Sequence, residues 1–144
     1  MKAKRVVLLV EDDPNDAFFL GRALEESGFN GQLLHLTDAD TAKAYLLGEG
    51  RYSDRSAHPA PDVIIADSAL TARGSGVELL EWMRAANLEK APAFVILSGA
   101  LEQRMRERAE AAGVKRVLLK MANYRETGKQ LRELFAELGT SEPG

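Results

Sequence analysis

Short apolar runs alternate with longer amphipathic segments along the whole chain. The apolar runs are VVLLV at 6–10, QLLHL at 32–36, DVIIAD at 62–67, AFVILS at 93–98 and RVLLK at 116–120. Runs of this length, rich in aliphatic and β-branched residues and bounded by polar ones, are typical of buried strands. The pattern therefore predicts five strands.

The segments between these strands predict five helices. Asp13 is a good N-cap with Pro14 at the first helical position, and Gly28 ends that helix. Thr37 or Asp38 opens the second helix in the same way. The predicted helical segments are AFFLGRALEES after Pro14, ADTAKAYLL at 39–47, VELLEWMRAAN at 77–87, LEQRMRERAEAAG at 101–113, and a last helix over about 123–138. In the last one, apolar residues recur with the spacing of one helix face.

Alternation of five strands with five helices predicts an α/β fold with a parallel sheet covered on both faces. Four of the strands end in polar residues. Ligands of open parallel sheets bind outside the carboxyl ends of the strands. We therefore expect the residues at these ends to meet in one crevice: Glu11, Asp12, Asp67, Ser98 and Lys120.

Composition narrows the class of protein. The 144 residues are 45% hydrophobic and 28% charged, as in an ordinary folded protein, and suffice for one domain. We place that domain at 4–139 and treat 140–144 as a tail or a truncated linker. Segment 49–61, with two prolines and two serines, predicts a long surface loop.

The absence of cysteine excludes disulfides and thiolate metal sites and fits a cytoplasmic location. A formal charge of −3 gives no electrostatic footprint for nucleic acid. The apolar runs are too short for a membrane span or a signal peptide. We expect neither a nucleic acid nor a membrane as a partner.

Adjacent acids at the end of a buried strand require an explanation. Like charges about 4 Å apart repel by roughly 4 kcal/mol at the effective dielectric of a protein surface. We interpret Asp13 as a helix cap, but Glu11 and Asp12 face a matching Asp67. The sequence thus predicts a positive group, such as a cation, at this point.

The order of the polar residues at the strand ends resembles that in the receiver domain of two-component response regulators. The pair Glu11-Asp12 stands at the first strand end, Asp67 at the third, Ser98 at the fourth and Lys120 at the fifth. The resemblance covers about residues 4 to 139. It implies a five-stranded flavodoxin-like sheet in the order 2-1-3-4-5, with two helices on one face and three on the other.

The resemblance also implies a chemistry. Asp67 would be the phosphoacceptor and form an aspartyl phosphate. Mg²⁺ would be held by Glu11, Asp12, Asp67 and the backbone carbonyl of Ala69, with Glu11 acting through a water. Lys120 and the Ser98 hydroxyl would contact the phosphoryl group. The donor would be a histidine kinase or a phosphotransfer protein.

In the same family the output surface is the fourth helix, fifth strand and fifth helix, through which we expect a downstream protein to be contacted. Only six residues follow Leu138, too few for a DNA-binding or catalytic effector, so we expect the effect to be exerted by contact. The chain would not be a conventional turnover enzyme.

Several positions depart from the family pattern. Thr71 stands where proline is common, Met121 replaces the proline after the lysine and predicts a trans bond, and Val117 replaces the usual aromatic residue. Ala69 cannot orient a hydrolytic water, so we predict slow loss of the phosphate.

Two alternatives to a phosphorylated receiver stay open. One is a receiver-like interaction module that is not normally phosphorylated. The other is a phosphatase of the haloacid dehalogenase type, a class that carries a D-x-D motif at its nucleophile. Here Asp67 is followed by Ser68 and Ala69, so the second acid of that motif is missing.

Overall fold

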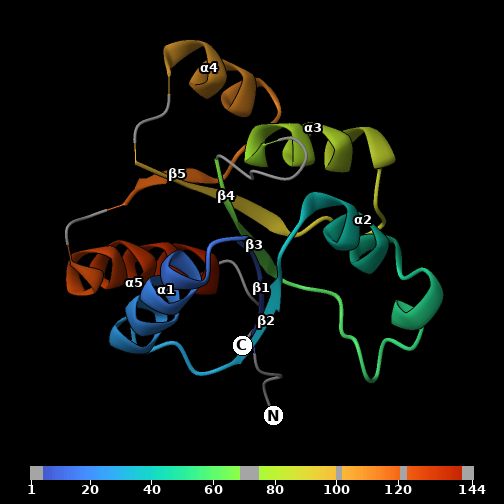
Figure 1. Ribbon diagram of the computed structural model, residues 1–144, viewed down its shortest axis with the longest axis horizontal. Helices are drawn as coiled ribbons and strands as arrows, with labels where there is room; N and C mark the ends of the chain where they lie inside the picture. Colours follow the sequence, from blue (N-terminus) through green and yellow to red (C-terminus); the bar gives the residue numbers. More distant parts are fainter. Residues whose placement is uncertain (1–4, 69–74, 100–101, 121–122, 141–144) are drawn as a thin grey trace.

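The computed structural model of the chain describes residues 5–68, 75–99, 102–120 and 123–140. Within these ranges the elements alternate regularly. The strands are β1 (Val6–Val10), β2 (Gln32–Leu36), β3 (Val63–Asp67), β4 (Ala93–Ser98) and β5 (Arg116–Leu119). The helices are α1 (Pro14–Glu26), α2 (Ala39–Leu47), α3 (Gly76–Ala86), α4 (Gln103–Ala111) and α5 (Tyr124–Thr140), with a short 3-10 helix η1 (Gly50–Tyr52). The strands form one parallel sheet in the order β2-β1-β3-β4-β5 (Figure 1), which confirms the predicted fold class.

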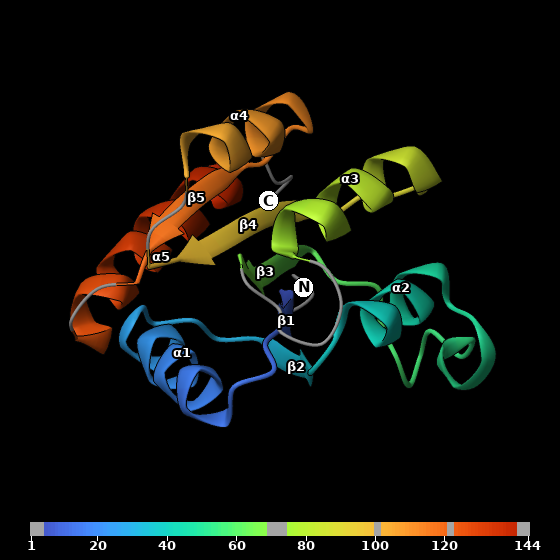
Figure 2. The same cartoon turned by 45° about the horizontal axis from the view of Figure 1, so that its top comes forward.

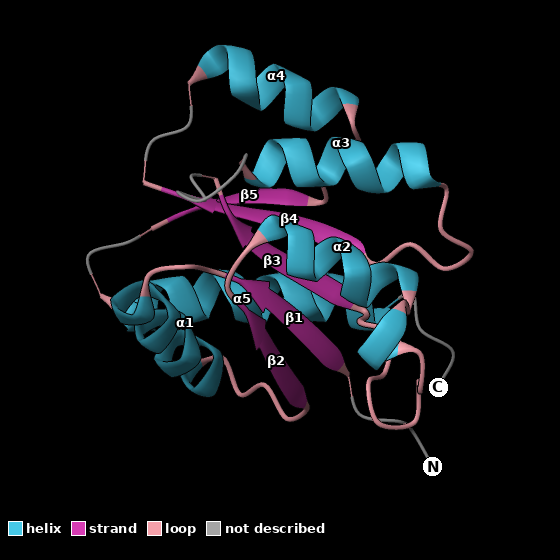
Figure 3. Cartoon of the chain, turned by 45° about the vertical axis from the view of Figure 1, so that its right-hand side comes forward, coloured by secondary structure: helices cyan, strands magenta, loops and turns pink. Residues whose placement is uncertain are grey.

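The sheet lies between two helical layers, each with its own apolar core. Side chains of β1, β3 and β4 alternate between the two faces, so Leu8 and Ile64 belong to one core and Val7 and Ile65 to the other. Helices α2, α3 and α4 cover the first face, and α1 and α5 cover the second (Figure 2). Figure 3 shows the twisted sheet passing between the two layers. Burial on both faces explains why these strands read as continuous apolar runs.

The helix caps follow the sequence prediction. The Asp13 side chain accepts hydrogen bonds from the backbone N–H groups of Asn15 and Asp16, and Asp38 caps α2 through the N–H of Thr41. Gly48 ends α2 in the left-handed conformation with φ of 67°. The N-caps Asp13 and Asp38 set where α1 and α2 begin, shortly after β1 and β2.

Segment 49–61 is more ordered than the predicted surface loop. It contains η1, whose Tyr52 is buried and packs its ring against Tyr45 of α2 with centroids 4.9 Å apart. The Tyr45 hydroxyl donates a hydrogen bond of 2.8 Å to the carbonyl of Pro59. His58 joins this aromatic cluster edge-on. Most of the segment lies at the surface as predicted, but the sequence did not predict η1 or the aromatic packing that anchors it to α2.

Helices α1 and α5 pack closely. A Cβ atom at Gly128 would lie 2.8 Å from the carbonyl oxygen of Ala23, so only glycine allows this approach. Helix α5 continues to Thr140, beyond the predicted end near Leu138. Residues 141–144 of the predicted tail lie outside the described residues.

Helix α4 contacts α3 largely through charged side chains. The Arg84 guanidinium donates hydrogen bonds of 2.7 and 2.8 Å to the carbonyls of Ala112 and Gly113 at the end of α4. Arg108 of α4 pairs with Glu81 of α3. In the described helix only Ala109 is fully buried. Helix α4 therefore combines a small apolar contact, through Ala109 and the partly buried Met105, with polar contacts to α3.

None of the helices described by the structure is both long enough and apolar enough to cross a membrane.

Candidate functional site

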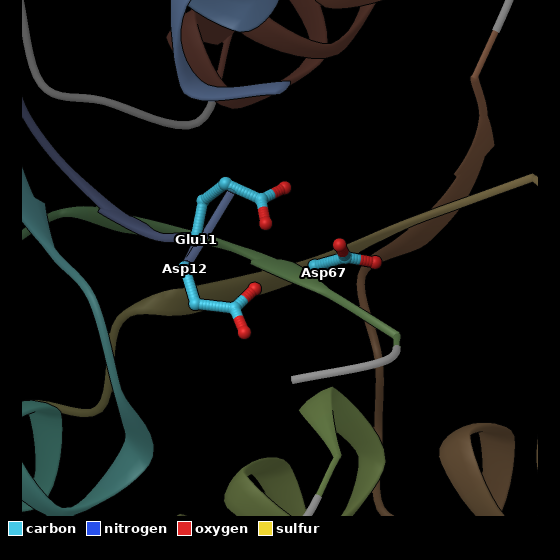
Figure 4. Close-up of side chains that lie close together, drawn as sticks. All are labelled: Glu11, Asp12 and Asp67. Atoms are coloured by element: carbon cyan, nitrogen blue, oxygen red, sulfur yellow. The ribbon is translucent and has the colours of Figure 1, made fainter. Parts of the chain in front are cut away.

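Three carboxylates converge where β1 and β3 end. Because Val10 pairs in register with Ala66, the residues that follow, Glu11 and Asp67, emerge side by side at the carboxyl edge. Glu11 and Asp67 are 2% and 8% exposed. One carboxylate oxygen from each of Glu11, Asp12 and Asp67 lies within 4.8 Å of the others (Figure 4). The sheet thus brings together three acids from distant parts of the sequence.

The pKa of the Glu11 carboxyl group is strongly raised in this cluster. Burial raises the pKa of Glu11 from its ordinary value of 4.5 to about 8, the hydrogen bond from the Asp13 N–H opposes this shift, and the Asp67 carboxylate adds to it. Near neutral pH, Glu11 therefore holds a proton unless a cation replaces it. Carboxylate oxygens are the donors that hard divalent cations prefer. The donor set fits such a cation.

Lys120 supplies a positive charge to the cluster. Its Nζ lies 3.2 Å from Asp67 Oδ2, 4.0 Å from Glu11 Oε1 and 2.9 Å from Asp16 Oδ2. Burial lowers the pKa of Lys120, but the hydrogen bonds and charges of Asp16 and Asp67 outweigh burial and raise it overall. Lys120 is therefore an ammonium at neutral pH.

Ser98 ends β4 beside the acids and is 1% exposed. The Ser68 hydroxyl donates a hydrogen bond of 3.0 Å to Ser98 Oγ. The backbone N–H of Ser68 bonds to Leu97, and that of Lys120 bonds to Ser98. These bonds tie the ends of β3, β4 and β5 together around the site.

The structure brings Glu11, Asp12, Asp67, Ser98 and Lys120 to the same edge of the sheet. Ala69, Thr71 and Met121 lie outside the described residues, so the predicted carbonyl ligand and the bond after Lys120 remain predictions. Val117 is half-buried on β5 and packs against the core formed with α2, α3 and α4.

Two contacts of the site were not predicted. Asp16, in the first turn of α1, makes the shortest of the carboxylate contacts described for Lys120. Ser68 makes the hydrogen bond to the Ser98 hydroxyl. An acid in the first turn of a helix is common because it complements the helix dipole, so the sequence alone gave no reason to single out Asp16.

One histidine and the tryptophan of the chain, His35 and Trp82, make structural contacts. His35 Nε2 lies 2.7 Å from the Glu11 carbonyl oxygen. Trp82 of α3 is partly buried against the core, with Lys43 Nζ 5.6 Å from its ring centroid. Trp82 thus serves in packing.

Together, a doubly wound sheet and a cluster of carboxylates with one ammonium at its carboxyl edge define an α/β protein whose site suits a divalent cation and an anionic group. The model of the response regulator receiver domain matches residues 7–132. The chain therefore belongs to the response regulator receiver domain family, whose members are signalling modules of two-component systems.

Individual relatives are similar over most of the fold. Response regulator Rcp1 of Synechocystis sp. is 29% identical over 92 residues, which is 64% of this chain and 60% of Rcp1. A structure of Rcp1 with Mn²⁺ bound has a TM-score of 0.78 at 24% identity, covering 96% of this chain and 97% of that one.

The phosphorylated cyanobacterial phytochrome response regulator RcpA has a TM-score of 0.83 at 25% identity, over 97% of this chain and 98% of RcpA. The bacteriophytochrome response regulator RtBRR has a TM-score of 0.77 at 27% identity, over 98% of this chain and 81% of RtBRR.

Proposed function

We propose that this receiver domain accepts a phosphoryl group on Asp67 from a histidine kinase or phosphotransfer protein and signals by changing its protein contacts. The observation that carries this proposal is the meeting of three carboxylates with the Lys120 ammonium at the carboxyl edge of the sheet. Such a site combines a nucleophile with groups that offset negative charge.

In the proposed reaction a carboxylate oxygen of Asp67 attacks phosphorus, the P–N bond to the donor imidazole breaks, and the imidazole leaves. Glu11, Asp12, Asp67 and the backbone carbonyl of Ala69 would hold Mg²⁺. When bound, Mg²⁺ offsets the charge of the acids and of the phosphoryl group. The Lys120 ammonium lies 3.2 Å from Asp67 Oδ2, within reach of a phosphoryl oxygen on that side chain.

Ser98 would donate its hydroxyl to another phosphoryl oxygen. In the described structure this hydroxyl accepts from Ser68, so its own proton is available for a further acceptor. Output would then pass to a partner protein through α4, β5 and α5. The exposed charges of α4 and the 46% exposed Leu119 of β5 give that surface a mixed character suited to a protein partner.

We further infer a phytochrome-type histidine kinase as the donor. RcpA and RtBRR, at 25% and 27% identity, are response regulators of phytochromes. The inference predicts faster phosphotransfer from an autophosphorylated phytochrome kinase than from a histidine kinase that lacks a photosensory module. Equal transfer from both would contradict it.

The central test measures phosphate incorporation from acetyl phosphate by intact mass, with and without Mg²⁺. Wild type and a control variant of an exposed acid in α2, Asp40→Asn, should gain one phosphoryl group only with Mg²⁺. Asp67→Asn should gain none. Incorporation that persists in Asp67→Asn would reject the assigned acceptor, and no incorporation into any variant would favour an interaction module that is not normally phosphorylated.

A further inference from the structure

Lys120 has two carboxyl groups near it besides the proposed phosphoacceptor, Glu11 at 4.0 Å and Asp16, which is the nearest. Asp16 Oδ2 lies 2.9 Å from Lys120 Nζ, closer than Asp67 Oδ2 at 3.2 Å. Asp16 comes from the first turn of α1, whereas Lys120 follows β5, 104 residues later. The pair therefore joins α1 to the end of β5 across the site.

The position of this pair indicates more than a surface contact. The Asp16 side chain is 39% exposed, that of Lys120 25% and that of Asp67 9%, so the pair lies at the rim of the site with the ammonium partly inside the protein. A lysine side chain is flexible, and a single acid would leave its nitrogen free to turn about that contact. Asp16 and Asp67 are both within hydrogen-bond distance of Nζ, whereas Glu11 Oε1 is 4.0 Å away, so the two hydrogen bonds from different elements restrict Nζ to a small region next to Asp67.

An ammonium also has enough donors for this arrangement. Its three N–H groups can serve Asp16, Asp67 and one further oxygen at the same time. A phosphoryl group on Asp67 would bring that further oxygen. Lys120 can therefore contact the phosphoryl group without giving up Asp16.

We propose that Asp16 is a positioning residue that acts through Lys120, holding its ammonium where a phosphoryl oxygen arrives on Asp67. This inference rests on the proposed function and adds a residue to it. Asp16 itself does not touch the reacting atoms. Its effect should depend entirely on the presence of Lys120.

The sign of the effect separates positioning from simple charge repulsion. Asp16 is negative and near the site, so removing its charge would by electrostatics alone favour an anionic donor and speed up phosphorylation. Loss of positioning has the opposite effect, because Lys120 would stabilise the transferring phosphoryl group less well. A slower reaction after removal of this negative charge would thus indicate that Asp16 acts by positioning Lys120.

The experiment follows phosphorylation by acetyl phosphate and Mg²⁺ over a range of donor concentrations. Asp16→Asn should lower the rate at saturating donor by about two- to fivefold, in keeping with the strength of a partly exposed ion pair, without raising the half-saturating concentration. Asp16→Glu should recover most of the loss. Glu25→Gln, an exposed acid at the far end of α1, should behave as wild type.

A double-mutant cycle then tests the dependence on the lysine. In a Lys120→Met background, Asp16→Asn should cause no further loss of the saturating rate, because no ammonium remains to be positioned. Additive losses, an unchanged rate in Asp16→Asn, or a faster rate would each overturn the inference while leaving the proposed function intact. No phosphorylation of wild type would instead reject the proposed function.

A second measurement tests the contact between Asp16 and Lys120 in the absence of phosphorylation. Trace acetylation with acetic anhydride, read by mass spectrometry, compares Lys120 with the exposed Lys129 in the same molecule. Asp16→Asn should speed acetylation of Lys120 relative to Lys129 by about two- to fivefold. An unchanged ratio would mean that Asp16 does not hold the ammonium in solution.

Discussion

Replacing Gly76 by alanine should damage the site without touching any of its charged groups. Gly76 is the first residue of α3, and a Cβ atom there would lie 2.5 Å from the backbone carbonyl oxygen of Asp67. Ordinary C···O contacts begin at about 3.3 Å, so the two segments must separate by about 0.8 Å. Because the opposing atom belongs to the backbone of β3, no side-chain rotation relieves the contact.

The expected cost is that of overpacking, about 1–3 kcal/mol of unfolding free energy. The chain offers a matched control in Gly21, which lies inside α1 with no atom within 4 Å of an added Cβ. Gly21→Ala should stabilise the protein by about 0.5–1 kcal/mol, because alanine favours the helix. The two glycine-to-alanine changes should therefore have opposite signs.

Urea denaturation of both variants beside wild type measures this difference, and phosphate incorporation measures its effect on Asp67. Gly76→Ala should unfold at a lower urea concentration and incorporate phosphate more slowly, because Asp67 shifts relative to Glu11 and Asp12. Gly21→Ala should keep the wild-type rate. A Gly76→Ala protein as stable as Gly21→Ala would refute the steric argument.

Three further changes should have measurable effects. Because burial raises the pKa of Glu11 to about 8, Mg²⁺ should bind wild type more tightly as pH rises from 6 to 8, with proton release seen by calorimetry. Binding to Glu11→Gln should not change with pH in this way. Mg²⁺ affinity of wild type that is independent of pH would contradict the prediction. The native state binds the Glu11 proton between pH 4.5 and 8 and the unfolded chain does not, so metal-free stability should fall as pH rises across that window. Asp13→Ala should cost about 1 kcal/mol in urea denaturation through loss of the α1 cap, and an unchanged midpoint would exclude that role. Tyr45→Phe should cost about 1 kcal/mol and speed amide exchange in residues 49–61, because the hydroxyl that bonds to Pro59 is lost; unchanged exchange would show that this hydroxyl does not anchor the segment.

The sheet was predictable because burial on both faces produces a simple sequence pattern. Strands such as Val63–Asp67 read as unbroken apolar runs, and their polar last residues mark the edge where a site forms. Parallel pairing then places Asp67 beside Glu11 whatever the sequence between them. The fold and the carboxylate cluster thus follow from local patterns combined with one topological rule.

The contacts of Asp16 and Ser68 could not be predicted in this way. Asp16 has the local features of any acid in a first helical turn, and its contact with Lys120 depends on how α1 and β5 are placed in space. Ser68 bonds to Ser98 only because β3 and β4 end at the same level. The order of segment 49–61 was missed for a similar reason, since Tyr52 is buried by a helix earlier in the chain.

The polar attachment of α4 has a consequence for how this domain could change shape. The helix is held by Arg84 and by the pair of Arg108 with Glu81, and of its described side chains only Ala109 is fully buried. Its own apolar contribution to the core is small, namely Ala109 and the partly buried Met105, so its local opening should cost less than global unfolding. We therefore expect α4 to open locally while the sheet and the acidic site stay folded, and a partner that binds the docked or the released helix would shift the balance between the two.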